Sequence, residues 1–214
     1  MSIRETQAGI AAILARGPVI PVIVIDDAAD AAPLARALVA GGLRVLEVTL
    51  RTAAALTAVR AMRDAVPEAI VGVGTVLTCG QLDEAHRAGA AFAVSPGATD
   101  RLLSDAAGHP VPLLPGAGTV SEAMRLREHG YEHLKFFPAE AAGGVRFLSS
   151  LASVIADLRF CPTGGITPAN ATAYLTLPNV LCVGGSWMIP RDRLKAADWA
   201  GISALAAEAS RLGG

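Results

Sequence analysis

The sequence predicts a single (β/α)8 TIM barrel over residues 1–214, with an extra helix before the first strand. Eight apolar, β-branched runs are separated by alanine- and leucine-rich stretches with helical spacing. Such an alternation is typical of a parallel sheet covered by helices. No linker or low-complexity segment divides the repeats, so one closed barrel fits the whole chain. An open doubly wound sheet is the alternative.

The predicted strands follow one another regularly along the chain. They are expected at residues 19–25, 45–50, 70–77, 92–95, 111–114, 133–137, 158–161 and 180–183. The clearest helical stretches between them cover residues 31–40, 53–65 and 81–88. Residues 2–16 form the extra helix, which we expect to plug the N-terminal mouth of the barrel.

Capping patterns mark several of the predicted helix ends. Capping boxes, in which two side chains satisfy free backbone amides at a helix start, are expected at Ser2-x-x-Glu5, Thr78-x-x-Gln81 and Thr119-x-x-Glu122. Left-handed glycines are expected to close helices at Gly41, Gly89, Gly108 and Gly130. Thr167 and Pro168 predict an N-cap followed by proline at the first helical position.

The composition excludes some partners and suggests another. The chain is 52% hydrophobic and 17% charged, with a net charge of −1. Such a balance offers no basic footprint for nucleic acid. The apolar content exceeds what one barrel of this length needs to bury. We therefore expect an apolar surface patch to be covered in a homo-oligomer.

The chain carries no sign of a membrane segment or a metal site. No apolar stretch reaches the roughly 18 to 20 residues of a membrane span. An N-terminal apolar run is preceded by Glu5 and closed by Arg16, without a cleavage site, so a cytoplasmic protein is expected. Three cysteines are odd in number and lack metal-ligand spacing, which predicts reduced thiols, mostly buried.

Lys135 is one of only two lysines, and it lies in the apolar run of residues 133–138. Arginine stays charged in any setting, whereas a buried lysine can lose its proton and become a nucleophilic amine. A Schiff-base lysine needs this property. The alternative is a lysine whose ammonium reaches water from a strand end. The other lysine, Lys195, lies in a polar segment near the C-terminus.

Further polar side chains stand near the C-terminal ends of the predicted strands, where the chemistry of this fold collects. The second strand offers Glu47 and, just beyond it, Arg51, and the third runs to Thr75. A charge directed between strand and helix would have neither water nor a partner. We therefore expect Glu47 and Lys135 to point into the barrel, where they can reach each other. A purely structural buried ion pair is the alternative.

Two glycine pairs indicate a phosphate site. They follow the seventh and eighth predicted strands, whose loops bind phosphate in many barrels of this kind. Bare amides and one hydroxyl let a phosphate approach closely there. These groups belong to Gly164, Gly165, Gly184, Gly185 and Ser186.

Five segments resemble the 2-keto-3-deoxy-6-phosphogluconate (KDPG) aldolases of the Entner–Doudoroff pathway. They are VLEVTLRT at 45–52, VGVGTVL at 71–77, FFPAE at 136–140, FCPTGGI at 160–166 and VGGSW at 183–187. The resemblance implies a class I aldolase, a lyase that cleaves KDPG to pyruvate and glyceraldehyde 3-phosphate. The same machinery would serve 4-hydroxy-2-oxoglutarate, which yields pyruvate and glyoxylate. It also implies a homotrimer without metal or organic cofactor.

The resemblance further implies a role for each matching residue. Lys135 would form the Schiff base and Glu47 would move protons. The substrate carboxylate would be held by Arg51 and Thr75. The phosphate would be bound by Gly164, Gly165, Gly185 and Ser186, while Thr163, Phe137 and Pro96 would line the pocket.

Three other functions remain open from the residues. A related aldolase for the galactonate epimer would use the same Schiff-base groups. A sugar-phosphate isomerase or epimerase would keep the barrel and phosphate site but needs paired acid and base groups rather than one buried lysine. A non-catalytic sugar-phosphate-binding barrel would bind the ligand without turning it over.

Overall fold

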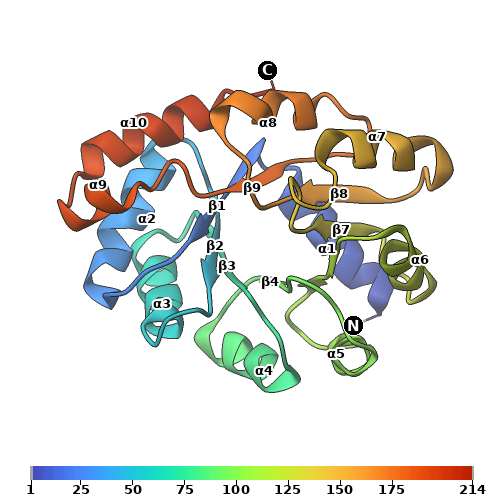
Figure 1. The fold of residues 1–214 in the computed structure, drawn as a ribbon. Coiled ribbons are helices and arrows are strands. Elements are labelled where there is room, and N and C mark those ends of the chain that lie inside the picture. Colours follow the sequence, from blue (N-terminus) through green and yellow to red (C-terminus); the bar gives the residue numbers. More distant parts are fainter. Residues whose placement is uncertain (1, 214) are drawn as a thin grey trace.

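The computed structural model describes residues 2–213, whose strands form the predicted barrel (Figure 1). All paired strands run parallel, as short apolar strands joined by helices require. The strands are β1 (Val19–Ile23), β2 (Val45–Thr49), β3 (Ile70–Gly74), β4 (Ala93–Val94), β5 (Leu113–Leu114), β6 (Gly116–Ala117), β7 (His133–Phe136), β8 (Arg159–Pro162) and β9 (Val183–Gly185).

These nine segments make eight barrel strands. Hydrogen bonds connect β5, β4, β3, β2, β1 and β9 in that order, and a second set connects β6, β7 and β8. Pro115 separates β5 from β6, and its carbonyl accepts the backbone N–H of Lys135 at 2.9 Å, so β5 and β6 are halves of the fifth strand. Isolated bridges from Phe160 to Val180 and from Thr163 to Gly184 join β8 to β9 and close the barrel.

The helices surround the strands, with α1 inside the outer ring (Figure 1). They are α1 (Ile3–Leu14), the short 3-10 helix η1 (Ala28–Asp30), α2 (Ala31–Ala40), α3 (Ala55–Ala65), α4 (Cys79–Ala88), α5 (Asp100–Ala106), α6 (Val120–Glu128), α7 (Gly144–Val154), α8 (Pro168–Leu175), α9 (Arg191–Lys195) and α10 (Trp199–Ser210). Capping boxes begin α1 at Ser2 and α6 at Thr119, as predicted.

Two apolar clusters hold the barrel together. The larger one lies between the strands and the outer helices. The smaller one joins α1 to alternate strand residues, among them Val45, Val94 and Leu114, and therefore fills the interior of the barrel. The predicted buried thiols of Cys161 and Cys182 belong to this inner cluster, and both are free. A hydrogen bond with Cys161, together with burial, raises the pKa of the Cys182 thiol well above its usual range.

Helix α1 closes the N-terminal mouth of the barrel, as predicted. Its buried Gln7 accepts the backbone N–H groups of Glu132 and His133 at 3.0 and 2.9 Å, at the start of β7. On the same helix, Ile10 and Leu14 are each about 1% exposed and pack in the inner cluster. A substrate can therefore enter the barrel only from the opposite mouth, at the C-terminal ends of the strands.

One predicted helix end is wrong by a residue. Gly41 has φ −78°, and the left-handed residue after α2 is Gly42, with φ +92°. Gly41 serves a different purpose, because a Cβ there would lie 2.5 Å from the Cβ of Ala206 on α10. The predicted glycines at Gly89 and Gly130 do have positive φ.

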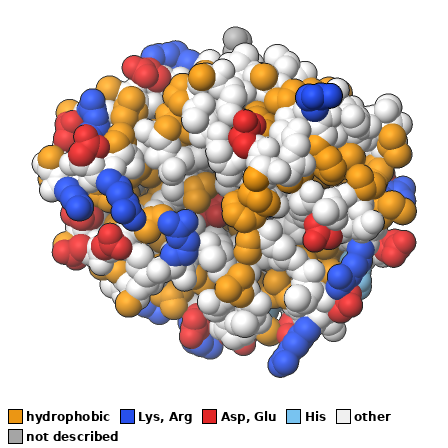
Figure 2. Space-filling model, in the orientation of Figure 1, with side chains coloured by type: hydrophobic (Ala, Val, Ile, Leu, Met, Phe, Trp, Pro, Cys, Tyr) orange, Lys and Arg blue, Asp and Glu red, His pale blue; other side chains and the backbone are white. Residues whose placement is uncertain are grey.

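The surface gives no single-sign patch on the face shown in Figure 2. Lys and Arg side chains are interspersed with Asp and Glu around the edge of that face. Among residues 2–213, no helix is both long enough and apolar enough to span a bilayer.

Candidate active site

Lys135 and Glu47 form a buried pair inside the barrel. The Lys135 Nζ lies 3.2 Å from the Glu47 Oε1, and the two side chains are 7% and 5% exposed. The residues come from β7 and β2, which are the sixth and second of eight strands and thus stand on opposite sides of the barrel. The predicted inward direction of both side chains is thereby confirmed. Nζ also lies 5.6 Å from the centre of the Phe137 ring.

Gly74 makes room for this pair. It is the last residue of β3, next to β2, and a Cβ at its position would lie 2.1 Å from the Glu47 Oε1. Real Cβ atoms do not approach oxygen so closely, so any side chain at position 74 would displace the carboxylate. The missing side chain at position 74 therefore leaves the space in which the Glu47 carboxylate reaches Lys135.

Arg51 and Thr75 lie in the chain segments that leave the neighbouring strands β2 and β3. The N–H of Leu50 donates to the carbonyl of Gly74 at 2.8 Å, which holds the two segments together. Arg51 is exposed, and within residues 2–213 its side chain forms no hydrogen bond or ion pair. Its forked donors are thus free for a ligand carboxylate.

Thr75 departs from the predicted geometry. The strand was expected to continue to residue 77, which would place Thr75 on the face of Val73, but β3 ends at Gly74. Thr75 instead has φ +61°, a left-handed conformation that is uncommon for a β-branched residue. Backbone strain of this kind persists where the surrounding structure holds a residue in place, and it is concentrated at active and ligand-binding sites.

The two glycine pairs lie side by side, one after β8 and the other within β9. The bridge from Thr163 to Gly184 joins the segment just after β8 to the middle of β9. The second glycine pair, predicted to follow the last strand, therefore lies within it. A Cβ on Gly184 would lie 2.3 Å from the Thr163 Oγ1, so the close approach of the loops requires glycine there. Gly164 and Gly165 have φ of +101° and +80°, a left-handed backbone conformation that favours glycine at both positions. Ser186 is exposed next to them.

A cavity of about 350 Å3 opens beside the end of the lysine strand. Pro96 and Phe137, two of the predicted pocket residues, line it together with Gly118 and Glu122. Glu122 accepts the N–H of Gly118 at 2.8 Å, and this bond lowers the pKa of its carboxyl. Thr163 does not line this cavity. It is buried, and its N–H donates to the carbonyl of Phe136 at 2.9 Å.

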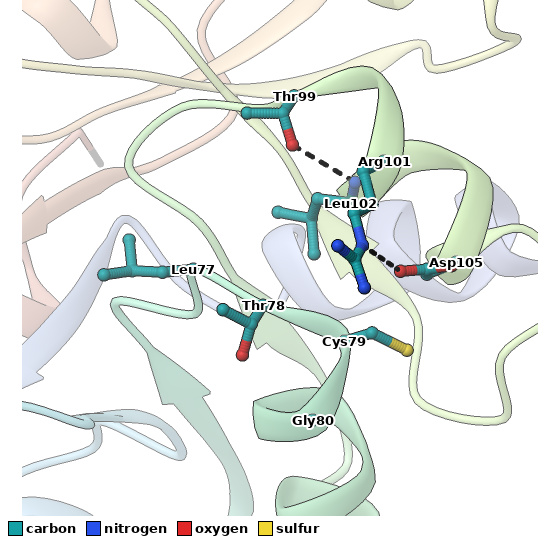
Figure 3. A pocket seen from close by; sticks show the side chains of 8 residues that line it. All are labelled: Leu77, Thr78, Cys79, Gly80, Thr99, Arg101, Leu102 and Asp105. Atoms are coloured by element: carbon teal, nitrogen blue, oxygen red, sulfur yellow. Dashed lines mark hydrogen bonds and ion pairs between the residues drawn. The ribbon is translucent and has the colours of Figure 1, made fainter.

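A second cavity, of about 250 Å3, lies between the starts of α4 and α5 (Figure 3). Its side chains include Leu77, Cys79, Arg101 and Asp105, and the catalytic candidates do not reach it. Burial and the nearby Asp105 raise the pKa of the Cys79 thiol, which opposes thiolate formation. This cavity therefore offers no competing nucleophile.

Comparison with known proteins identifies relatives over nearly the whole chain. The model of the KDPG and KHG aldolase family matches residues 10–205. The KHG/KDPG aldolase of Escherichia coli K12 is 56% identical over 197 residues, which cover 92% of each chain.

Solved structures of KDPG aldolases are also similar. The enzyme of Legionella pneumophila, captured with pyruvate as a covalent carbinolamine, is 48% identical, with a TM-score of 0.92 over 96% of this chain and 99% of that one. The enzyme of Zymomonas mobilis, solved with 3-phosphoglycerate, is 50% identical, with a TM-score of 0.92 over 96% and 97%.

Proposed function

The chain belongs to the KDPG and KHG aldolase family, and we propose that it cleaves KDPG to pyruvate and glyceraldehyde 3-phosphate through a Schiff base on Lys135. It acts as a class I aldolase, and 4-hydroxy-2-oxoglutarate is its second substrate. The observation that carries the assignment of residues is the contact between Lys135 and Glu47 inside the barrel, 3.2 Å between Nζ and Oε1. An amine that must be neutral to attack a ketone is here placed beside a group that can take its proton.

The reaction begins when the Lys135 amine attacks the substrate ketone. The carbinolamine loses water to give a protonated imine. The bond between the carbons α and β to the imine carbon then breaks, and the imine accepts the electrons of that bond. Glyceraldehyde 3-phosphate leaves, and the remaining enamine takes a proton at carbon to become the imine of pyruvate. Water then releases pyruvate and restores the amine.

Glu47 moves the protons that these steps require. The same carboxylate gives up a proton when water leaves and accepts one from the hydroxyl whose carbon departs, so it alternates between acid and base within a turnover. Its position next to Nζ supports this role. Gly74 supports it as well, because its missing side chain leaves the space that Glu47 occupies.

The other predicted residues hold the two charged ends of the substrate. Arg51 and Thr75 bind the carboxylate next to the ketone, and the exposure of Arg51 supports this assignment. The phosphate at the far end lies against the amides of Gly164, Gly165 and Gly185 and the hydroxyl of Ser186. The bridge between Thr163 and Gly184 supports a single site made from both glycine pairs and Ser186.

Borohydride reduction in the presence of pyruvate tests the Schiff base directly. We expect a reduced pyruvyl adduct on Lys135, identified by peptide mass spectrometry. The chain carries its own internal control, because exposed Lys195 is the only other lysine. Labelling should persist in Lys195→Arg and disappear in Lys135→Arg. An adduct on Lys195, or none on folded protein, would contradict the assignment.

We further propose that three copies of the chain form a ring, because the large exposed apolar side chains lie on two different surfaces of the barrel. Among residues 2–213, four large hydrophobic side chains are exposed: Leu77 at 58%, Val120 at 38%, Met124 at 50% and Val154 at 75%. Three of them line a groove of about 280 Å3 between α6 and α7. Leu77 stands at the cavity between α4 and α5, and Arg101, which pairs with Asp105, lies on the α5 side of that cavity (Figure 3).

The two surfaces suit a head-to-tail contact. The groove between α6 and α7 carries Glu128 and an ion pair of Arg127 with Asp157, and the surface around Leu77 carries Arg101, which is 93% exposed and pairs with Asp105. Both surfaces lie on neighbouring sides of the barrel rather than on opposite sides (Figure 1). A repeated contact between such surfaces turns sharply, and this geometry favours a small closed ring over an extended filament.

Mixing two variants tests this interface. Leu77→Asp and Met124→Asp each damage one surface, so each variant alone should sediment as a monomer of 21.8 kDa, while the unmodified chain forms a trimer. An equal mixture retains one intact pair of surfaces and should form a dimer but nothing larger. Ala204→Asp, on the exposed side of α10, is the matched control and should remain trimeric. Trimeric single variants, or a monomeric mixture, would disprove this interface.

A further inference from the structure

Glu140 belongs to the FFPAE segment but has no part in the chemistry described above. It lies in the loop after β7, five residues beyond Lys135. The N–H of Glu140 donates to the carbonyl of Gly164 at 3.1 Å, and the N–H of Ala139 donates to that of Thr163 at 2.8 Å. These bonds tie the loop that follows the lysine strand to the first glycine loop.

The Glu140 side chain reinforces the same connection. A Cβ on Gly165 would lie 2.6 Å from the Glu140 Cγ, so the side chain packs directly on the glycine backbone. Its carboxylate accepts the hydroxyl of Tyr174, a fully buried residue on α8. A Cβ on Gly144 would lie 3.0 Å from that hydroxyl and 3.2 Å from the Glu140 Oε1. Glycines at 144 and 165 therefore leave the space that the Glu140–Tyr174 pair occupies.

The Tyr174 hydroxyl keeps its proton. Burial and, after it, the bond to Glu140 raise the pKa of the Tyr174 hydroxyl well above its usual range. The hydroxyl thus remains a donor at any working pH. A carboxylate beside amides that bind a dianionic phosphate would weaken that binding if it were free to turn toward them. The Tyr174 bond holds it on the α8 side.

We propose that Glu140 and Tyr174 are positioning residues that set the distance between Lys135 and the phosphate-binding glycines, an inference that rests on the proposed function. KDPG must place its ketone at Lys135 and its phosphate at the glycine loops at the same time. A rigid connection between the two loops fixes this span in advance, so that little ordering is left for the moment of binding. A substrate without phosphate gains nothing from the connection.

Two substrates separate positioning from general stability. Tyr174→Phe removes the hydroxyl and should raise KM for KDPG about tenfold, the effect of one charge-assisted hydrogen bond. Glu140→Gln keeps an acceptor oxygen but loses the charge that strengthens the bond, and should raise KM for KDPG about threefold. Both should leave kcat for KDPG and kcat/KM for 4-hydroxy-2-oxoglutarate within about twofold. The double variant should be little worse than Tyr174→Phe alone, because both act through one bond.

The outcomes also separate this inference from the phosphate assignment. Ser186→Ala removes a proposed phosphate ligand and should raise KM for KDPG alone. If it does so and Tyr174→Phe and Glu140→Gln do not, the positioning role is wrong while the proposed function stands. Equal losses on both substrates, with a lower melting temperature, would reduce the pair to a structural contact and likewise overturn the inference. If Ser186→Ala also has no selective effect, the phosphate site itself is misplaced.

Discussion

Lys135→Met is expected to lower kcat/KM for KDPG by at least about 10⁴-fold, the order of loss when an enzyme is deprived of its covalent nucleophile. Methionine keeps an unbranched side chain of similar length in the barrel, but its thioether cannot form an imine. Without the imine, the carbanion left by carbon–carbon cleavage has no electron acceptor. Cleavage should be followed by coupling glyceraldehyde 3-phosphate to a dehydrogenase, with circular dichroism as the check on folding.

Lys135→Arg separates the loss of the nucleophile from the loss of the charge. The guanidinium stays protonated and keeps a cation opposite Glu47, yet it forms no Schiff base. We expect both variants to be inactive and Lys135→Met to melt at the lower temperature, because there the buried Glu47 loses its partner. Substantial turnover by folded Lys135→Met would remove the Schiff-base role from this residue, whatever the melting temperatures.

Most of the barrel could be predicted from the sequence because its signals are local. Apolar strands and helical spacing repeat eight times, and alternation along β2 and β7 is enough to direct Glu47 and Lys135 into the interior. Strand ends were less predictable. The apolar run at 70–77 continues past Gly74, but the left-handed Thr75 ends the strand there. Backbone strain of this kind comes from contacts that a periodic pattern does not record.

The parts of the site that escaped prediction depend on approaches between distant segments. In the sequence, Gly74 is an ordinary strand glycine. Only the structure shows that the Glu47 carboxylate occupies the space beside it. Tyr174 reads as a helix residue of the core, since nothing in its neighbourhood points to Glu140, which precedes it by 34 residues. Gly41 and Gly42 are adjacent glycines in the sequence, and only the structure shows that Gly42 is the left-handed one while Gly41 packs closely against α10.

Glu47→Gln should slow exchange of the pyruvate methyl protons with solvent by at least about 10²-fold, the usual contribution of a positioned general base. The amide fits the space beside Gly74 and can still hydrogen-bond to Lys135, but it cannot accept a proton from the imine's methyl group. Exchange in deuterated water, followed by proton NMR, isolates this step, because neither carbon–carbon cleavage nor the phosphate takes part in it.

Glu140→Gln is the matched control for this measurement. It makes the same change from carboxylate to amide in the loop after the lysine strand, and pyruvate carries no phosphate to be positioned. Exchange should therefore proceed at the unmodified rate in Glu140→Gln and only slowly in Glu47→Gln. Unchanged exchange in Glu47→Gln, with the borohydride adduct on Lys135 still formed, would mean that another group or a bound water moves the proton. The buried contact between Glu47 and Lys135 would then serve to hold the amine in place rather than to exchange protons with the substrate.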